Sequence, residues 1–124
     1  MADLVKLTFC LRKKPDLTYE EFYDYWLNKH GPLVRSFRDV LGAWKYTQLH
    51  RLDLPLGAAL AEVRGAPEPY DGIAEMWWQS MSDLEAAMTS EAGREAGRAL
   101  LEDEKKFIDL ENSPVWLNAV HDFV

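Results

Sequence analysis

The chain has 124 residues, of which 48% are hydrophobic and 28% charged, with a formal net charge of -7 and a pI near 4.9. This length predicts one domain, residues 1–124, that buries a core without disulfides or a metal ion. The acidic balance argues against nucleic acid and against an anionic membrane surface as partners, because both attract basic patches.

The predicted environment is the cytoplasm. No stretch reaches the roughly 18 consecutive apolar residues of a membrane span, and the N-terminus has no long apolar run after its charges. Cys10 is the single cysteine, so an intrachain disulfide is impossible and a reducing compartment is compatible with the sequence.

The first predicted strand covers residues 4–12, where apolar and polar residues alternate with a period of two. The same period recurs over residues 43–52 and predicts the second strand. That second stretch places Trp44, Tyr46, Gln48 and His50 on one side, where their polar groups could line a pocket.

Between these strands, a helix is predicted to begin at Thr18, which can form a capping box with Glu21. Phe22, Trp26 and His30 are spaced by four residues, so the imidazole shares an apolar face with two aromatic rings. The Gly-Pro pair that follows should end or kink the helix, which leaves His30 near a helix end. Helical spacing resumes after the pair until Gly42, so a bent helical segment is predicted.

Residues 53–71 are rich in glycine and proline and predict a long connection, with a helical turn or two over residues 58–63. The apolar residues in this connection indicate that it covers another surface.

A third strand, residues 72–80, is apolar on both sides, with Trp77 on one side and Met76 and Trp78 on the other. Helices can cover only one side of a sheet. A second sheet, most economically from an identical chain, would cover the other, so we expect a homodimer.

Ser82 and Glu85 have capping-box spacing and predict the start of a second helical region, which continues to Leu110. Residues 114–124 read as the fourth strand. The order strand, helix, strand, strand, helix, strand predicts an α+β, ferredoxin-like βαββαβ fold with an antiparallel sheet.

Glu104 lies in the middle of an apolar stripe, where burial would raise its pKa and make it a candidate general acid or base. Asp103 lies at the edge of that stripe. Because both helical regions cover the same sheet face, His30 could meet these carboxylates in a shared cavity. Alternatively, the His30 ring binds backbone carbonyls and Glu104 pairs with a basic side chain.

Candidate substrate contacts are Tyr46 and His50, whose strand face either lines a pocket or is exposed. His121 could face the pocket or a partner. Trp26 and Trp77 are candidate aromatic walls or core residues. The histidines lack metal-ligand spacing, and there is no phosphate loop or dinucleotide fingerprint, so we expect no metal and no cofactor.

Three segments of the chain together resemble the EthD-domain family. They contain Phe22, Tyr25, Trp26, His30, Gly31, Pro32 and Leu33, then Pro69, Tyr70, Asp71 and Gly72, then Asp103, Glu104, Phe107, Ile108 and Asp109. The resemblance implies the ferredoxin-like fold of the dimeric α+β-barrel superfamily, in which two sheets pair into one barrel.

The resemblance also implies a range of activities. Members resemble dehydratases or decarboxylases of polyketide-derived aromatic intermediates, and the family's name comes from an accessory protein of ether degradation. Relatives in the superfamily include cofactor-free monooxygenases and muconolactone isomerases. All of them handle small, oxygenated organic molecules.

These observations favour a cofactor-independent lyase or isomerase acting on a small aromatic or polyketide-like substrate. In this hypothesis His30 moves a proton, Glu104 or Asp103 orients it or acts as the second acid or base, and Tyr46 and His50 position a substrate oxygen. The alternatives are a non-catalytic binding or accessory protein and a cofactor-free monooxygenase.

Overall fold

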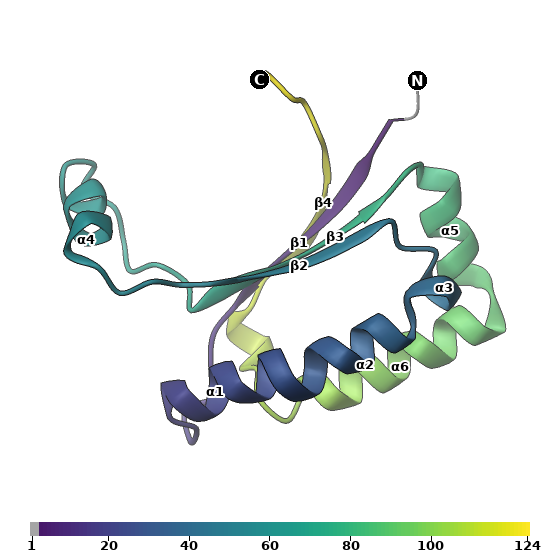
Figure 1. Cartoon of the computed structure of the whole chain (residues 1–124), viewed down its shortest axis with the longest axis horizontal. Coiled ribbons are helices and arrows are strands. Elements are labelled where there is room, and N and C mark those ends of the chain that lie inside the picture. Colours follow the sequence, from purple (N-terminus) through teal and green to yellow (C-terminus); the bar gives the residue numbers. More distant parts are fainter. Residues whose placement is uncertain (1–2) are drawn as a thin grey trace.

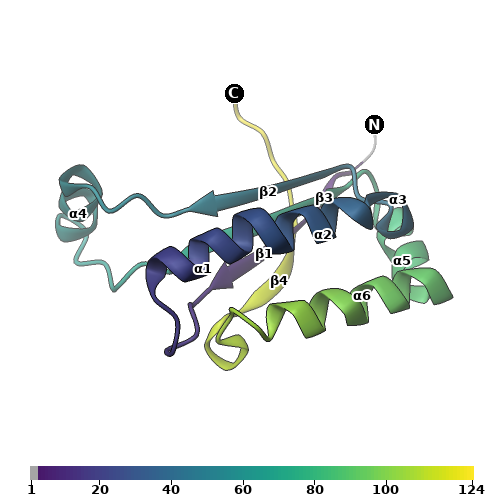
Figure 2. The ribbon, with the colours of Figure 1, turned by 60° about the horizontal axis from the view of Figure 1, so that its bottom comes forward.

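The computed structural model of the chain describes residues 3–124. Four antiparallel strands form one sheet in the order β2-β3-β1-β4, and the helices other than α4 lie against one of its faces (Figures 1 and 2). The strands are β1 (Val5–Leu11), β2 (Lys45–His50), β3 (Gly72–Trp78) and β4 (Val115–Ala119). This arrangement confirms the predicted α+β, ferredoxin-like fold.

The helical segments occupy all three connections between strands. The first connection holds α1 (Tyr19–Tyr25), the π-helical turn η1 (Trp26–His30), α2 (Gly31–Ser36) and α3 (Arg38–Leu41). The second holds α4 (Pro55–Glu62), and the third holds α5 (Met81–Thr89), α6 (Glu91–Glu104) and the 3-10 turn η2 (Leu110–Asn112).

The first helix begins as predicted, with both hydrogen bonds of the capping box between Thr18 and Glu21. The Gly-Pro pair does not end the helical segment, which continues to Leu41 and stops at Gly42 as predicted. The Gly31 N–H donates to the Trp26 carbonyl five residues back, forming a π turn. Pro32 has no N–H to place in a regular helix, and the wider turn lets the chain continue helically into α2.

The second helical region differs from its prediction at both ends. Ser80 rather than Ser82 caps α5, because the Ser80 hydroxyl accepts a hydrogen bond from the Asp83 backbone N–H in the first turn. The regular helix α6 ends at Glu104 instead of Leu110. Phe107 lies in the turn that follows and is fully buried against the sheet-facing core.

The two faces of the sheet have different surroundings. Met76 lies opposite Leu7 of β1 and Tyr46 of β2, and these three face the helices. Trp77, the next residue, points to the other face, which no helix of the described chain covers (Figure 1). The helices therefore bury one side of β3 only, as its two-sided apolar pattern predicted.

The connection that carries α4 extends away from the rest of the molecule (Figure 1). No residue of α4 is buried, and Leu56 and Val63 are 71% and 79% exposed. Within the described chain the connection does not cover another surface, because its apolar side chains are exposed, and the expectation that it covers some other surface stays a prediction.

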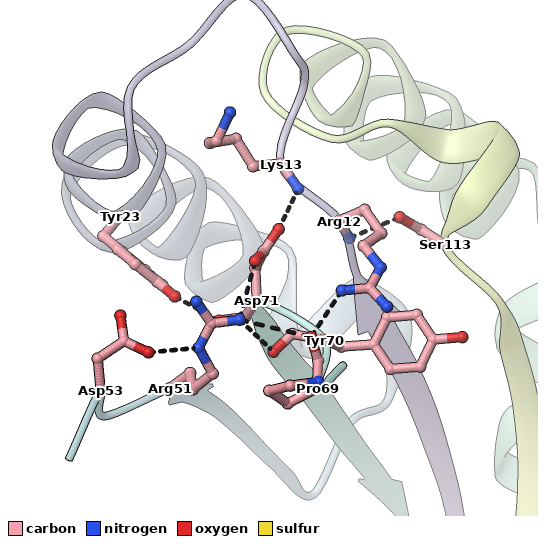
Figure 3. A network of polar contacts seen from close by, with 9 residues as sticks. All are labelled: Arg12, Lys13, Tyr23, Arg51, Asp53, Pro69, Tyr70, Asp71 and Ser113. Carbon is pink, nitrogen blue, oxygen red and sulfur yellow. Dashed lines mark hydrogen bonds and ion pairs between the residues drawn. The ribbon is translucent and has the colours of Figure 1, made fainter. Parts of the chain in front are cut away.

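The base of that connection is tied to the domain by Asp71, which is 5% exposed (Figure 3). Its carboxylate accepts from the Lys13 backbone N–H at 2.7 Å and from Arg51 at 3.1 Å. Its carbonyl accepts from the Tyr23 hydroxyl at 2.5 Å. The network joins α1, β1 and the start of β3, so the motif around Asp71 has a structural role.

The core lies between the sheet and the helices. The largest fully buried side chains are Leu11, Phe22, Trp26, Trp78 and Phe107. Over residues 3–124, none of the helices combines the length and apolar character needed to cross a lipid bilayer.

Candidate active site

A cavity of about 360 Å³ lies between the helices and the sheet. Its walls are mostly apolar and include Leu7, Phe9, Met76, Leu100 and Leu101. Three titratable side chains from the helices and β2 line it as well: His30, Tyr46 and Glu104. An apolar cavity with a few convergent polar groups is the usual form of a small-molecule site.

His30 is 5% exposed and is held by a carboxylate. Its Nδ1 lies 2.8 Å from Asp103 Oδ2, and Asp103 Oδ1 accepts a hydrogen bond of 2.5 Å from the Tyr25 hydroxyl. Lys106 Nζ lies 3.5 Å from the same carboxylate. An ionised carboxylate can only accept hydrogen bonds, so the proton of the neutral imidazole sits on Nδ1 and Nε2 carries the lone pair.

The pKa shifts support this assignment. Burial by itself raises the pKa of Asp103, but the hydrogen bonds from Tyr25 and His30 outweigh it, and the pKa of Asp103 lies below its ordinary value. Burial lowers the pKa of His30, and the bond to Asp103 opposes that shift only in part. At neutral pH Asp103 is therefore ionised and His30 is neutral, which is the form of histidine that can accept a proton.

Glu104 faces the other nitrogen of the same ring. Its Oε2 lies 3.9 Å from His30 Nε2. Burial, followed by the nearby charge of Asp103, raises the pKa of Glu104 to about 7. A carboxyl with this pKa is substantially protonated at neutral pH, so the cavity contains a neutral base and a potential proton donor side by side.

Tyr46 contributes a hydroxyl to the cavity from β2. Its oxygen accepts a hydrogen bond of 3.0 Å from Gln48 Nε2. Burial raises the pKa of Tyr46, against the effect of this hydrogen bond, so the phenol stays protonated. Because Tyr46 acts as the acceptor toward Gln48, its own O–H is free to donate to a bound molecule.

A side chain of the sheet contacts the π turn. Gln48 Nε2 donates at 2.8 Å to the Trp26 carbonyl, the same oxygen that accepts from the Gly31 N–H. A Cβ at Gly31 would lie 3.0 Å from that Nε2. Glycine therefore allows β2 to approach the helix at the residue next to His30, where Gln48 contacts the π turn that carries this histidine.

Trp26 forms one wall of the cavity, as predicted, and its indole is tightly enclosed. A Cβ at Gly72 would lie 2.4 Å from the indole, so the sheet and the ring touch there. His50 stacks on the indole with ring centroids 4.3 Å apart and planes at 8°. His50 therefore supports Trp26 and does not itself line the cavity, contrary to its predicted substrate contact.

Two further candidate substrate contacts lie elsewhere in the chain. Trp77 is on the opposite face of the sheet, where the ammonium groups of Lys6 and Lys45 lie 4.9 and 5.0 Å from its ring centroid. His121 lies beyond β4, which ends at Ala119 rather than at residue 124, and it is exposed. In this chain neither residue reaches the cavity.

The structure adds Tyr25, which the sequence prediction did not place at the site, and it places Gln48, predicted on the same strand face as Tyr46, against the π turn. In a regular α-helix, residues five apart point about 140° away from each other, so Tyr25 was not expected beside His30. The π turn changes that angle and lets both contact Asp103. The Gly-Pro pair after His30 was the available signal. Within residues 3–124, no cluster of three acidic, histidine or cysteine side chains could hold a metal ion.

Solved structures share this fold. An EthD family protein from Bacillus halodurans is 19% identical, with a TM-score of 0.63 over 95% of this chain and 99% of that one. Hydroxynitrile lyase from Passiflora edulis is 12% identical, with a TM-score of 0.64 over 100% and 99%. SnoaB, a cofactor-independent oxygenase from Streptomyces nogalater, is 13% identical, with a TM-score of 0.58 over 99% and 98%.

Identities this low establish the common fold and leave activity open. Other structures that match the chain include ferredoxin-like proteins described as dimeric. No curated protein compared with the chain matches it. The sequence profile of the EthD domain matches residues 14–111, a span that contains His30, Asp103 and Glu104. The chain therefore belongs to the EthD domain family.

Proposed function

We propose that the protein is a cofactor-independent lyase or isomerase that acts on a small oxygenated aromatic or polyketide-like molecule. The observation that carries the proposal is the 2.8 Å contact between His30 Nδ1 and Asp103, which leaves Nε2 as a base in an apolar cavity. Glu104, 3.9 Å from Nε2, supplies the second acid or base.

In a dehydration, His30 Nε2 would remove a proton from the carbon next to a carbonyl group. Glu104 would protonate the departing hydroxyl, which leaves as water while the carbon–carbon double bond forms. Tyr46 would donate its hydrogen bond to the carbonyl oxygen, where negative charge develops. A proton transfer from the imidazolium to the glutamate would then restore both groups, and each of these steps is a proton transfer that requires no redox group.

A carrier of hydrophobic intermediates would need the apolar walls but not the titratable pair. The buried imidazole with its lowered pKa, next to a carboxyl with a raised pKa, favours the enzyme over the carrier.

The decisive experiment measures turnover by the wild type and by His30→Gln on β-hydroxy ketones fused to an aromatic ring and on aromatic cyanohydrins. We expect His30→Gln to lower the rate by about a hundredfold to ten-thousandfold, the usual contribution of a general base, with an unchanged circular dichroism spectrum. His121→Gln, a change at an exposed histidine outside the cavity, is the matched control. A folded His30→Gln variant with the wild-type rate would rule out the assignment.

A second candidate is a cofactor-free monooxygenase, favoured by the shared fold of the oxygenase SnoaB. The same base would deprotonate a phenol, and the electron-rich anion would react with molecular oxygen. Oxygen consumption with a hydroquinone-type substrate, dependent on His30, would favour this reaction, whereas product formation under argon would favour the lyase or isomerase.

A further inference from the structure

A second cleft, of about 490 Å³, lies next to the catalytic cavity. It is bounded by α2, α3 and the beginning of β2. The two hollows share four wall residues, Val34, Leu41, Tyr46 and Met76. Because these four side chains line both hollows, the cleft and the cavity are adjacent.

The cleft is lined by two arginines, Arg35 and Arg38, and by Lys45, in a protein whose net charge is -7. Arg38 donates to the carbonyls of Ala43 and Trp44 at 3.3 and 3.2 Å, which holds its guanidinium at the start of β2. Among the described residues, neither Arg35 nor Arg38 forms an ion pair with a carboxylate. Arg38 also lines a hollow with Asp39 and Asp83, but neither carboxylate forms an ion pair with it and neither lines this cleft.

We propose that this cleft binds a carboxylate carried by the substrate, while the ring of the substrate enters the catalytic cavity. The guanidinium group of Arg35, which has no acidic partner in the described part of the chain, is suited to a planar carboxylate, which it can bind through paired hydrogen bonds. Arg38 adds a second positive charge, although two of its nitrogens already donate to backbone carbonyls. Trp44 adds an aromatic surface at the same cleft. The substrate class is thus an aromatic or cyclic carboxylic acid. That the bound acid is a substrate rests on the proposed function.

The test compares the binding of 1-naphthoate and methyl 1-naphthoate by isothermal titration calorimetry. We expect the acid to bind more tightly than the ester, and 0.5 M sodium chloride to reduce this difference, because salt screens charges at an exposed site. Arg35→Gln should weaken binding of the acid by about three- to tenfold and leave the ester unchanged. Arg35→Lys, which keeps the charge but not the paired hydrogen bonds, should give an intermediate affinity.

Arg98→Gln is the matched control, because it removes the same charge as Arg35→Gln at an exposed position of α6 that lies outside both hollows. Equal affinity for acid and ester in the wild type would overturn the proposal. The proposal would also be overturned if Arg98→Gln weakened binding of the acid as much as Arg35→Gln does. Calorimetry measures binding and needs no turnover. If His30→Gln still binds the acid more tightly than the ester, the carboxylate site is supported even when the proposed reaction fails its own test.

Discussion

Asp103 and Glu104 are neighbours in the chain, yet their carboxyl groups have opposite pKa shifts. Asp103 receives hydrogen bonds from Tyr25 and His30, which stabilise its ionised form. Glu104 is buried beside that negative charge, so its neutral form is favoured. The different surroundings of two adjacent residues thus place an anchor and a proton donor on either side of one imidazole.

The hydrogen bond between Asp103 and His30 Nδ1 predicts a positioning role for Asp103. Asp103→Asn replaces an acceptor-only carboxylate by an amide and removes the charge that holds the Nδ1 proton in place. We expect the rate to fall by about 10²- to 10⁴-fold, with a smaller change in KM, and nitrogen-15 NMR of His30 should show loss of the single Nδ1–H tautomer.

Tyr25→Phe, which removes one donor to the same carboxylate, is the graded comparison and should have a weaker effect. An Asp103→Asn variant with an unchanged tautomer and an unchanged rate would contradict the role.

The raised pKa of Glu104 also predicts a pH dependence of stability. Since the native state holds this proton more tightly than the unfolded chain, it binds more protons between about pH 4.5 and 7. The contribution of Glu104 to the free energy of unfolding therefore falls as the pH rises through this window, by on the order of 3 kcal/mol.

Glu104→Gln should remove that decline, which chemical denaturation at pH 5, 6, 7 and 8 would detect as a difference from the wild type. The lowered pKa of His30 acts in the opposite direction, and the difference between the two proteins isolates Glu104. Glu95→Gln, at an exposed position of α6, is the control and should follow the wild type. Parallel curves for the wild type and Glu104→Gln would refute the prediction.

At the scale of elements, two glycines let the first helix and the sheet approach each other. Gly31 leaves room for Gln48, and Gly72 leaves room for the Trp26 indole. Both contacts position the π turn that carries His30. The helix is thereby held against β2 and β3 beside the cavity. Both glycines therefore lie next to residues of the proposed site.

Gly72→Ala should be strongly destabilising. The added Cβ would lie 2.4 Å from the indole and 2.7 Å from the Leu49 carbonyl, and the backbone on that side cannot move freely. We expect a loss of about 3 kcal/mol in the free energy of unfolding, at the upper end of overpacking effects. Gly57→Ala, in α4 with nothing within 4 Å, should be neutral or slightly stabilising, and urea denaturation compares the two. Equal stabilities would contradict the packing argument.

At the scale of the whole molecule, one face of the sheet remains without a cover in the described chain (Figure 1). That face carries Trp77, Leu49 and Trp116, of which the last two are each 46% exposed. It also carries the ion pair between Lys6 and Glu75. A mixed apolar and polar face of this kind is suited to pairing with a second sheet.

We therefore predict a homodimer through this face, detectable as twice the monomer mass by light scattering at micromolar concentration. Trp77→Asp should shift the protein to monomer, because it places a charge in the centre of the contact. Val40→Asp introduces the same charge at an exposed apolar position of α3, on the opposite side of the molecule, and should leave the dimer intact. A wild-type monomer at these concentrations would exclude the pairing.

The sequence alone determined the fold and the inward direction of His30. The period of two in the strands, the capping box at Thr18 and the spacing of Phe22, Trp26 and His30 are local patterns, and local backbone geometry converts them directly into elements. The apolar stripe also made Glu104 a candidate, with pairing to a basic side chain as the alternative, and in the structure the residue lines the cavity.

Only the tertiary structure decided how these residues act together. It placed Asp103 against Nδ1 and Glu104 near Nε2 of the same imidazole, brought Tyr25 to Asp103 through the π turn, and placed His50 behind Trp26. These outcomes depend on contacts between segments far apart in the chain, and on a helical turn whose geometry departs from the regular α-helix. Periodicity carries no information about either.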